Sequence, residues 1–370
     1  MPNLNFARRT EQFWNWFIEN EEALSAVALN PMPSDGDAEK LIGLVNEGLG
    51  MIAEDVKFNI GGDHEFTFTV SGNYELFFLL PYVTANLPAQ FRNKWKFYPC
   101  MPGTNGRSFG FRMLGLDAEI VDSDDVMVSA AKDAGGNSAT VRFWAKGWAK
   151  VDDRDCLNAF YILMEILIGE ALSAYCVEGI ERADSLAEDM FPLTKLQKWL
   201  LDNICENGEA PDPADMHSAY EMEPQNINEE PRSDVFVGTA NYMPLIDDYL
   251  DKSDNAYNTF AAFGARPMFL YFDYPANDEA RQAAFDKRNQ IMDMIEEKIL
   301  GERGSGKEIG VLLGGAMGIY RAYIDLLLYD EQLFIEKARE LLKDEPMAIL
   351  CKEFIHGGNE IPLFGHDDSI

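Results

Sequence analysis

A glycine-rich segment near residue 105 has the composition of an anion-binding site. Consecutive backbone N–H groups in a turn form a concave set of donors, and a nearby guanidinium adds positive charge. Glycine-rich turns without such a role are far commoner, so a plain connection is the alternative. The predicted ligand-binding residues are Gly103, Thr104, Asn105, Gly106 and Arg107.

A second glycine-rich segment, residues 301–308, matches the spacing of a phosphate-binding loop but not its chemistry. Glu308 stands where a Ser or Thr would hold magnesium. A phosphate loop also follows a strand and precedes a helix, whereas here we expect a helix before it and a strand after it. We therefore interpret the segment as a helix end and turn, with Gly301 as the C-cap.

Two glutamates in the apolar helical stretch 155–172 are candidates for acid–base chemistry, because burial raises the pKa of a carboxyl group. Glu165 and Glu170 are five residues apart, about 140° around a helix, so they do not form a side-by-side pair. The alternative is that one binds a backbone group or an arginine and the other reaches solvent. Arg321 and Asp325 share one face of a predicted strand about 13 Å apart, so we expect separate cross-strand partners.

The four histidines and five cysteines do not form a metal-binding or nucleophile pattern. The sequence contains no HxH, HxxxH, HExxH or CxxC. We therefore expect no metal, no cofactor and no catalytic residue. An odd number of widely spaced cysteines suits a reducing compartment. The cysteines are Cys100, Cys156, Cys176, Cys205 and Cys351.

The 370 residues carry a net charge of −32, from 63 acidic and 31 basic side chains. Such a surface repels phosphate backbones and anionic membranes, so we expect neither nucleic acid nor membrane as a partner. No stretch approaches the roughly 18 apolar residues of a membrane span, and no apolar signal region follows the N-terminus. We expect a soluble cytoplasmic protein. The charge either steers a basic protein partner toward it or only maintains solubility.

Residues 56–98 predict a compact unit of three strands and one helix. Phe66, Phe68 and Val70 alternate with threonines, the period of a strand with one buried face. We expect strands at 56–60, 65–71 and 95–98, with a helix at 73–87. Later strands are expected at 126–131, 139–145, 175–180, 235–237, 268–272, 309–313 and 319–327, the last two joined by a turn at 314–318. Further helices are expected at 10–29, 37–52, 155–172, 192–205, 241–251, 256–263, 278–300, 331–342 and 346–355.

Residues 207–233 hold four prolines among many acidic and amide side chains. They predict an exposed linker or a long wrap-around loop. The expected domains are therefore residues 1–206 and 234–370. The order helix, strand, hairpin, strand, helix occurs in both portions. This order indicates an α+β fold of two sandwich portions, each an antiparallel sheet with helices on one face.

The first helix carries aromatic residues over an arc of about 200°, wider than the single stripe of a surface helix. It therefore packs on two sides or presents aromatic residues to another chain, for example in a homodimer. The stretch 155–172 is apolar nearly all round, which predicts burial on several sides. The residues expected at an interface are Trp14, Trp16 and Phe17.

Several short motifs resemble parts of a group of uncharacterised bacterial proteins. One is the aromatic run of residues 13–17 with Glu19, Asn20 and Glu21. The others are Leu87-Pro88 followed by Trp95-Lys96-Phe97, and residues 314–320 with Tyr323 and Asp325. The resemblance implies a bacterial, cytoplasmic α+β protein without an assigned activity. It carries over no catalytic residue.

Our first hypothesis is a non-enzymatic protein-binding protein whose acidic surface meets a more basic partner. An immunity-type inhibitor of a bacterial toxin is one concrete version. The second hypothesis is an enzyme or small-molecule binder with a site near Arg107 or Glu165. The third is a scaffold that homodimerises through the aromatic first helix.

Overall fold

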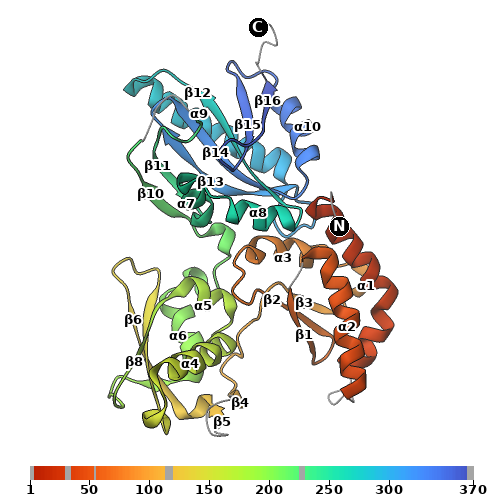
Figure 1. Cartoon of the computed structure of the whole chain (residues 1–370), viewed down its shortest axis with the longest axis vertical. Helices are drawn as coiled ribbons and strands as arrows, with labels where there is room; N and C mark the ends of the chain where they lie inside the picture. The colour runs from red at the N-terminus through yellow and green to blue at the C-terminus, as the bar shows by residue number, and fades with distance from the viewer. Residues whose placement is uncertain (1–3, 30–34, 54–55, 113–119, 225–229, 365–370) are drawn as a thin grey trace. The chain divides into compact units, whose positions relative to one another are not determined.

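The computed structural model describes residues 4–29, 35–53, 56–112, 120–224 and 230–364. The chain folds into two compact units (Figure 1). Unit 1 contains Met1–Phe66, Asn73–Phe97 and Ala214–Ile370, and unit 2 contains Thr67–Gly72 and Tyr98–Pro213. The segment 207–233 is thus divided, since its first seven residues belong to unit 2 and the rest to unit 1.

The N-terminal part of unit 1 combines helices with a small sheet. Large aromatic side chains fill the space between them, and Phe6, Phe13, Phe17 and Trp95 are at most 1% exposed. The three strands lie in the order β1-β2-β3. The elements are α1 (Phe6–Ala28), α2 (Asp35–Ile52), β1 (Lys57–Gly61), β2 (Glu65–Thr69), α3 (Leu76–Ala85) and β3 (Lys96–Tyr98).

The C-terminal part of unit 1 is a seven-stranded antiparallel sheet with the order β10-β11-β13-β14-β12-β15-β16. Helices α9 and α10 cover one face and form a continuous apolar core with it. Tyr249 of α7 packs on Phe269 and Phe354 of the opposite face. The strands are β10 (Ser218–Glu221), β11 (Val235–Ala240), β12 (Arg266–Asp273), β13 (Gly310–Gly318), β14 (Arg321–Leu328), β15 (Ile349–Glu353) and β16 (Glu360–Phe364). The helices are α7 (Met243–Asp251), α8 (Asn255–Ala262), α9 (Asp278–Ile295), its π-helical extension Glu296–Leu300, and α10 (Glu331–Leu342).

Unit 2 has a four-stranded sheet with the order β8-β7-β6-β9, in which β7 and β8 are parallel and the other pairs antiparallel. Three helices share its apolar core. The strands are β4 (Gly110–Arg112), β5 (Ile120–Asp122), β6 (Val126–Lys132), β7 (Ala139–Ala145), β8 (Val177–Arg182) and β9 (Phe191–Pro192), with β4 and β5 forming a separate pair. The helices are α4 (Asp153–Ile168), α5 (Glu170–Cys176) and α6 (Leu196–Asn203). Short 3₁₀ turns along the chain are Ala89–Phe91, Ser123–Asp125, Trp148–Lys150, Leu193–Lys195, Glu206–Gly208 and Pro213–Asp215.

The α+β fold predicted from the sequence is confirmed. The predicted helix 155–172 is instead two helices, because Gly169 has a φ of 90° and ends α4. That conformation is strained for a residue with a side chain. Within the described residues, no helix has both the length and the apolar character needed to cross a bilayer.

Two local predictions in the C-terminal sheet are wrong. Residues 314–318, predicted as a turn, lie inside β13. A side chain at Gly314 would place its Cβ 2.0 Å from the carbonyl oxygen of Thr239 on β11, so the glycine permits close approach of two strands. Residues 346–355, predicted as a helix, contain β15, which pairs with the edge of β12. Pairing with an available strand edge there outweighs local helix propensity.

Glu21 of α1 provides a pH-dependent test of the N-terminal core. Its side chain is 14% exposed and its Oε1 lies 2.7 Å from Nζ of Lys94. It also accepts hydrogen bonds from Ser25 Oγ and Trp95 Nε1. Burial alone would raise the pKa of Glu21, but these donors lower it to about 2 from an ordinary value of 4.5.

We expect Glu21→Gln to lower the free energy of unfolding by about 2 kcal/mol at pH 7. A lowered native-state pKa stabilises the fold above the unfolded-state pKa, so the difference should shrink as the pH falls from 4.5 toward 2. Urea denaturation at several pH values measures this. The exposed Glu19 on the same helix is the control, since Glu19→Gln should change stability by less than about 0.5 kcal/mol. A Glu21→Gln deficit that is constant with pH would contradict the account.

Candidate functional site

The predicted anion loop is a close-packed connection in unit 2. The N–H of Thr104 donates to the carbonyl of Leu167 at 3.0 Å, and the N–H of Asn105 donates to Oε1 of Gln197 at 2.9 Å. The N–H of Arg107 donates back to the carbonyl of Thr104 at 3.3 Å. Three amides that could have received an anion therefore already donate within the protein. Asn105, Gly106 and Arg107 are exposed, whereas Gly103 and Thr104 are half-buried. An anion site here stays a prediction.

The two glutamates of the α4–α5 region have different environments. Glu170 is 2% exposed, and its carboxylate accepts from the backbone N–H groups of Val70 at 3.0 Å, Ser71 at 3.1 Å and Met101 at 2.8 Å. It therefore fixes two other segments of unit 2, as the backbone-binding alternative predicts. Glu165 is half-buried, and burial followed by the charge of Glu170 raises the pKa of its carboxyl group. The two carboxylates do not converge on a common hydrogen-bond partner in the part of the chain described.

The aromatic residues predicted at an interface lie in the core of unit 1. Trp14 is 4% exposed, Trp16 is 5% exposed and Phe17 is fully buried. The indole N–H of Trp14 donates to the carbonyl of Val83 on α3 at 2.9 Å. Trp16 stacks on Phe13 with a centroid distance of 5.7 Å. These contacts correspond to the alternative in which the first helix packs on two sides.

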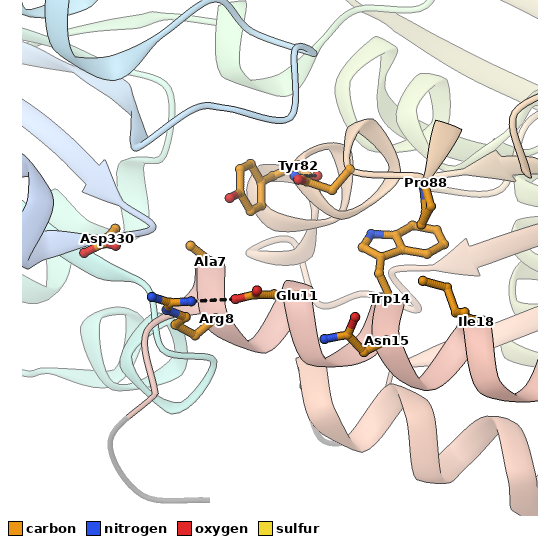
Figure 2. A pocket seen from close by; sticks show the side chains of 10 residues that line it. Ala7, Arg8, Glu11, Trp14, Asn15, Ile18, Tyr82, Pro88 and Asp330 are labelled. Atoms are coloured by element: carbon orange, nitrogen blue, oxygen red, sulfur yellow. Dashed lines mark hydrogen bonds and ion pairs between the residues drawn. The ribbon is translucent and has the colours of Figure 1, made fainter. Parts of the chain in front are cut away.

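A pocket of about 400 Å³ lies beside α1 and α3 in unit 1 (Figure 2). Its charged groups are already paired, since Nη1 of Arg8 lies 2.7 Å from Oε2 of Glu11. Asp330 caps α10 by accepting the N–H of Leu333 at 3.1 Å. These charged groups therefore pair with one another or cap a helix instead of converging on the space between them. The other lining residues are Ala7, Trp14, Asn15, Ile18, Tyr82, Asn86 and Pro88.

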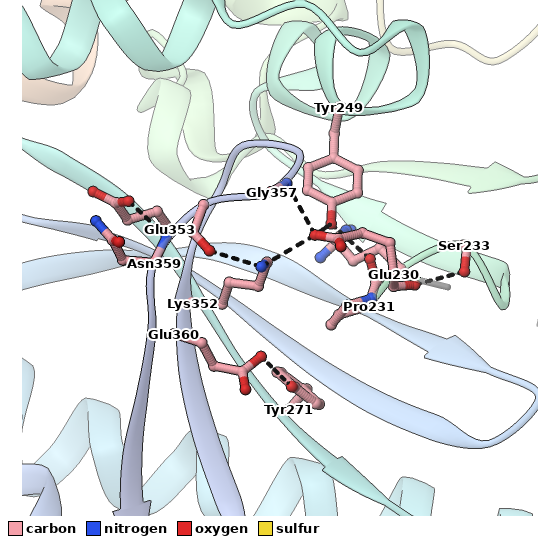
Figure 3. Close-up of polar contacts among 12 residues, drawn as sticks. Glu230, Pro231, Ser233, Tyr249, Tyr271, Lys352, Glu353, Gly357, Asn359 and Glu360 are labelled. Carbon is pink, nitrogen blue, oxygen red and sulfur yellow. Dashed lines mark hydrogen bonds and ion pairs between the residues drawn. The ribbon is translucent and has the colours of Figure 1, made fainter. Parts of the chain in front are cut away.

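A cluster of charged and phenolic side chains covers part of the sheet face opposite α9 and α10 (Figure 3). Nζ of Lys352 lies 3.1 Å from Oε1 of Glu230, and Gly357 donates its N–H to the same oxygen at 3.0 Å. The hydroxyl of Tyr249 donates to the carbonyl of Pro231 at 2.6 Å. The hydroxyl of Tyr271 donates to Glu360. The bonds of Glu230 and Pro231 hold the chain segment just before β11 against β15, the loop after β15 and α7, and the bond of Tyr271 joins β12 to β16.

The centre of this cluster is a buried ion pair between Arg232 and Asp325, which are 3% and 1% exposed. Nη2 of Arg232 also donates to the hydroxyl of Tyr220 at 2.9 Å. The guanidinium lies 4.5 Å from the ring centroid of Phe354, a cation–π distance. Burial alone would lower the pKa of Arg232, but the Asp325 carboxylate raises it overall, so the guanidinium stays charged.

Asp234, fully buried next to this pair, organises the turn between β13 and β14. Its Oδ2 accepts the N–H groups of Tyr320 at 2.9 Å and Arg321 at 3.1 Å. Tyr323 donates its hydroxyl to the other oxygen. Arg321 pairs at 3.0 Å with Asp273, the residue directly opposite it on β12, so the cross-strand partner predicted for Arg321 is confirmed. The cross-strand partner predicted for Asp325 is wrong, because Asp325 pairs with Arg232, which lies outside the strands.

The interactions of this cluster are structural, because they fix one chain segment to the sheet. Nearly all its charged groups bind one another or the backbone, and among the described residues no set of three or more His, Cys, Asp or Glu side chains could hold a metal. Sequence reasoning identified Asp325 but missed Arg232. Arg232 sits in the proline-rich segment and its partner is 93 residues away, so no local pattern could have indicated the pair.

The solvent-facing side of α4 is the surface feature that the sequence did not predict. Cys156, Phe160 and Leu163 of this helix lie in the core of unit 2. Its opposite side carries exposed apolar residues, so the predicted burial on several sides is wrong. We call these residues the α4 face. They are Leu157, 37% exposed, Tyr161, 39% exposed, and Ile162, 41% exposed.

Comparisons of the chain with protein-family models, curated proteins and solved structures found no match.

The Arg232–Asp325 pair makes a direct prediction about stability. Arg232→Met should lower the free energy of unfolding by about 3–5 kcal/mol, because it leaves a buried carboxylate without its counter-ion. The double variant Arg232→Met with Asp325→Leu should recover most of this loss, since both charges are then gone. Urea denaturation of Arg232→Met, Asp325→Leu and the double variant, followed by fluorescence, measures the coupling.

An exposed pair provides the control for this cycle. Lys198 and Asp202 of α6 lie 2.8 Å apart with side chains 80% and 54% exposed, so Lys198→Met should cost less than about 1 kcal/mol. A double variant that is as unstable as the sum of its two single changes would show that Arg232 and Asp325 are not coupled.

Proposed function

We propose that this chain is a non-enzymatic protein-binding protein whose acidic surface receives a more basic protein partner. The observation that supports this most strongly is the α4 face, where Leu157 and Ile162 are exposed on a helix whose other side is firmly packed. Apolar side chains on a rigid element are typical of the buried centre of a protein interface. A helix with apolar residues on both sides is normally covered on both sides.

The charge around the α4 face indicates what kind of partner fits. Asp152 and Asp153 are exposed at its N-terminal end beside the exposed Arg154, and Asp153 pairs with Arg182. The half-buried Glu165 lies at its other end. The whole chain has twice as many acidic as basic side chains, 63 against 31. The matching surface would have apolar anchors surrounded by lysine or arginine. Attraction between such surfaces accelerates association and weakens as salt rises.

An immunity-type inhibitor of a bacterial toxin is a concrete form of this function, because an inhibitor acts by binding alone. The bacterial origin and cytoplasmic location expected from the sequence belong to the same proposal. The competing proposal of a small-molecule site near Arg107 receives less support, since the amides of Thr104, Asn105 and Arg107 already have protein acceptors.

The test is a pull-down from native lysate of the source cells with the tagged full chain, at low and moderate salt. We expect one stoichiometric basic partner whose affinity falls as salt rises. Leu157→Lys combined with Ile162→Lys should reduce its affinity at least about tenfold, because the change removes two apolar anchors and adds repulsion. Affinities of the purified pair are measured by titration calorimetry.

Ile42 of α2 provides the matched control, because it is 50% exposed and lies outside unit 2. Ile42→Lys should leave the affinity within about twofold, and all three substitutions should change stability by little. Absence of a stoichiometric partner at both salt concentrations, or a partner that binds the α4 variant with unchanged affinity, would refute the proposal. If light scattering shows that the wild-type chain is a dimer and that the α4 variant is a monomer, the α4 face instead binds a second copy of this chain.

A further inference from the structure

Two cysteines of unit 2 that are distant in sequence lie side by side. Cys176 is the last residue of α5, and Cys205 follows the end of α6. Their Sγ atoms are 3.8 Å apart, and both thiols are free. A disulfide requires about 2.05 Å between sulfurs, so a movement of roughly 2 Å would join them. Side-chain rotation and small backbone shifts cover such a distance.

The two thiols differ in access to solvent. Cys176 is 2% exposed and belongs to the apolar core of unit 2. Cys205 is half-buried and packs against that core from its edge. An oxidant in solution therefore meets Cys205 first, and Cys176 stands in position to attack it afterwards. Cys205 is therefore placed as the attacking thiol and Cys176 as the resolving one, although neither has the lowered pKa of a dedicated redox sensor.

We propose that Cys176 and Cys205 form an intramolecular disulfide when the chain meets a small-molecule disulfide such as oxidised glutathione. Cys205 gives up its proton and attacks one sulfur of the oxidant, forming a mixed disulfide and releasing one glutathione thiolate. Cys176 gives up its proton and attacks the Sγ of Cys205, releasing the second. The protein loses two hydrogens, and the oxidant is reduced to two thiols.

Burial of the two thiols determines how fast the disulfide between Cys176 and Cys205 forms. Burial, followed by the influence of Cys205, raises the pKa of the Cys176 thiol to about 12, and burial raises the pKa of Cys205. Only the thiolate attacks a disulfide, so the reaction is slow near neutral pH. Its rate should rise by up to about tenfold per pH unit below these pKa values. The pair therefore responds to sustained oxidation, not to brief exposure.

The bond would close a loop that carries both edge strands of the four-stranded sheet. Strands β8 and β9 lie at the two ends of the order β8-β7-β6-β9, and both belong to the chain between the two cysteines. Edge strands pair on one side only and are among the first parts of a sheet to open. A cross-link that restricts their unfolded conformations should therefore stabilise unit 2.

The experiment incubates the purified full chain with mixtures of reduced and oxidised glutathione, then alkylates it and maps the peptides by mass spectrometry. We expect a linked pair of peptides containing Cys176 and Cys205 as the main product, forming faster at higher pH. The oxidised chain should show an unfolding temperature for unit 2 higher by on the order of 5 °C. Reduction should reverse both changes.

Variants separate this pair from the other cysteines. Cys205→Ser should abolish the link, whereas Cys100→Ser, which changes another half-buried thiol of unit 2, should leave it intact. Peptide mapping of the wild-type chain tests the disulfide by itself, so the test remains valid even if a variant fails to fold. Glutathione adducts without the link, a dominant link to another cysteine, or an oxidised chain no more stable than the reduced one would overturn the proposal.

Discussion

The apolar face of a sheet must be buried against other elements. Each helix of this chain can cover only part of such a face. In unit 1, α9 and α10 cover one face of the seven-stranded sheet. The opposite face receives α7 and an irregular segment that is anchored by paired charges. In unit 2, α4 covers the four-stranded sheet with one of its apolar sides. The other side remains exposed, and the functional proposal follows from that surplus of apolar surface.

Much of the fold was accessible from the sequence because it depends on local periodicity. The helix predicted at 331–342 has the bounds of α10, and the hairpin predicted at 126–145 is the pair β6 and β7. The secondary-structure predictions fail where a contact with a residue distant in sequence determines the local conformation. Gly314 signals a turn in sequence, yet it allows β11 to approach β13 closely. Residues 349–353 form a strand because β12 offers them an unpaired edge.

The candidate sites were harder to predict, because their residues come from different elements. A sequence shows that Trp14 and Trp16 are apolar, but only packing decides that they fill a core. The same ambiguity affected α4, whose pattern predicts burial on several sides, while one side is exposed. Net charge is different, because the excess of acidic residues is read from composition alone and does not depend on the fold.

Binding of a basic protein to the α4 face can be tested by site-specific photo-cross-linking in the source cells. A photoreactive amino acid at Asn158, which is exposed between Leu157 and Tyr161, would sample whatever covers the face, and the same group at Ile42 serves as the reference. We expect a cross-link from position 158, and not from position 42, to a single protein with an excess of lysine and arginine. Absence of any cross-link from position 158, or identical products from both positions, would contradict it.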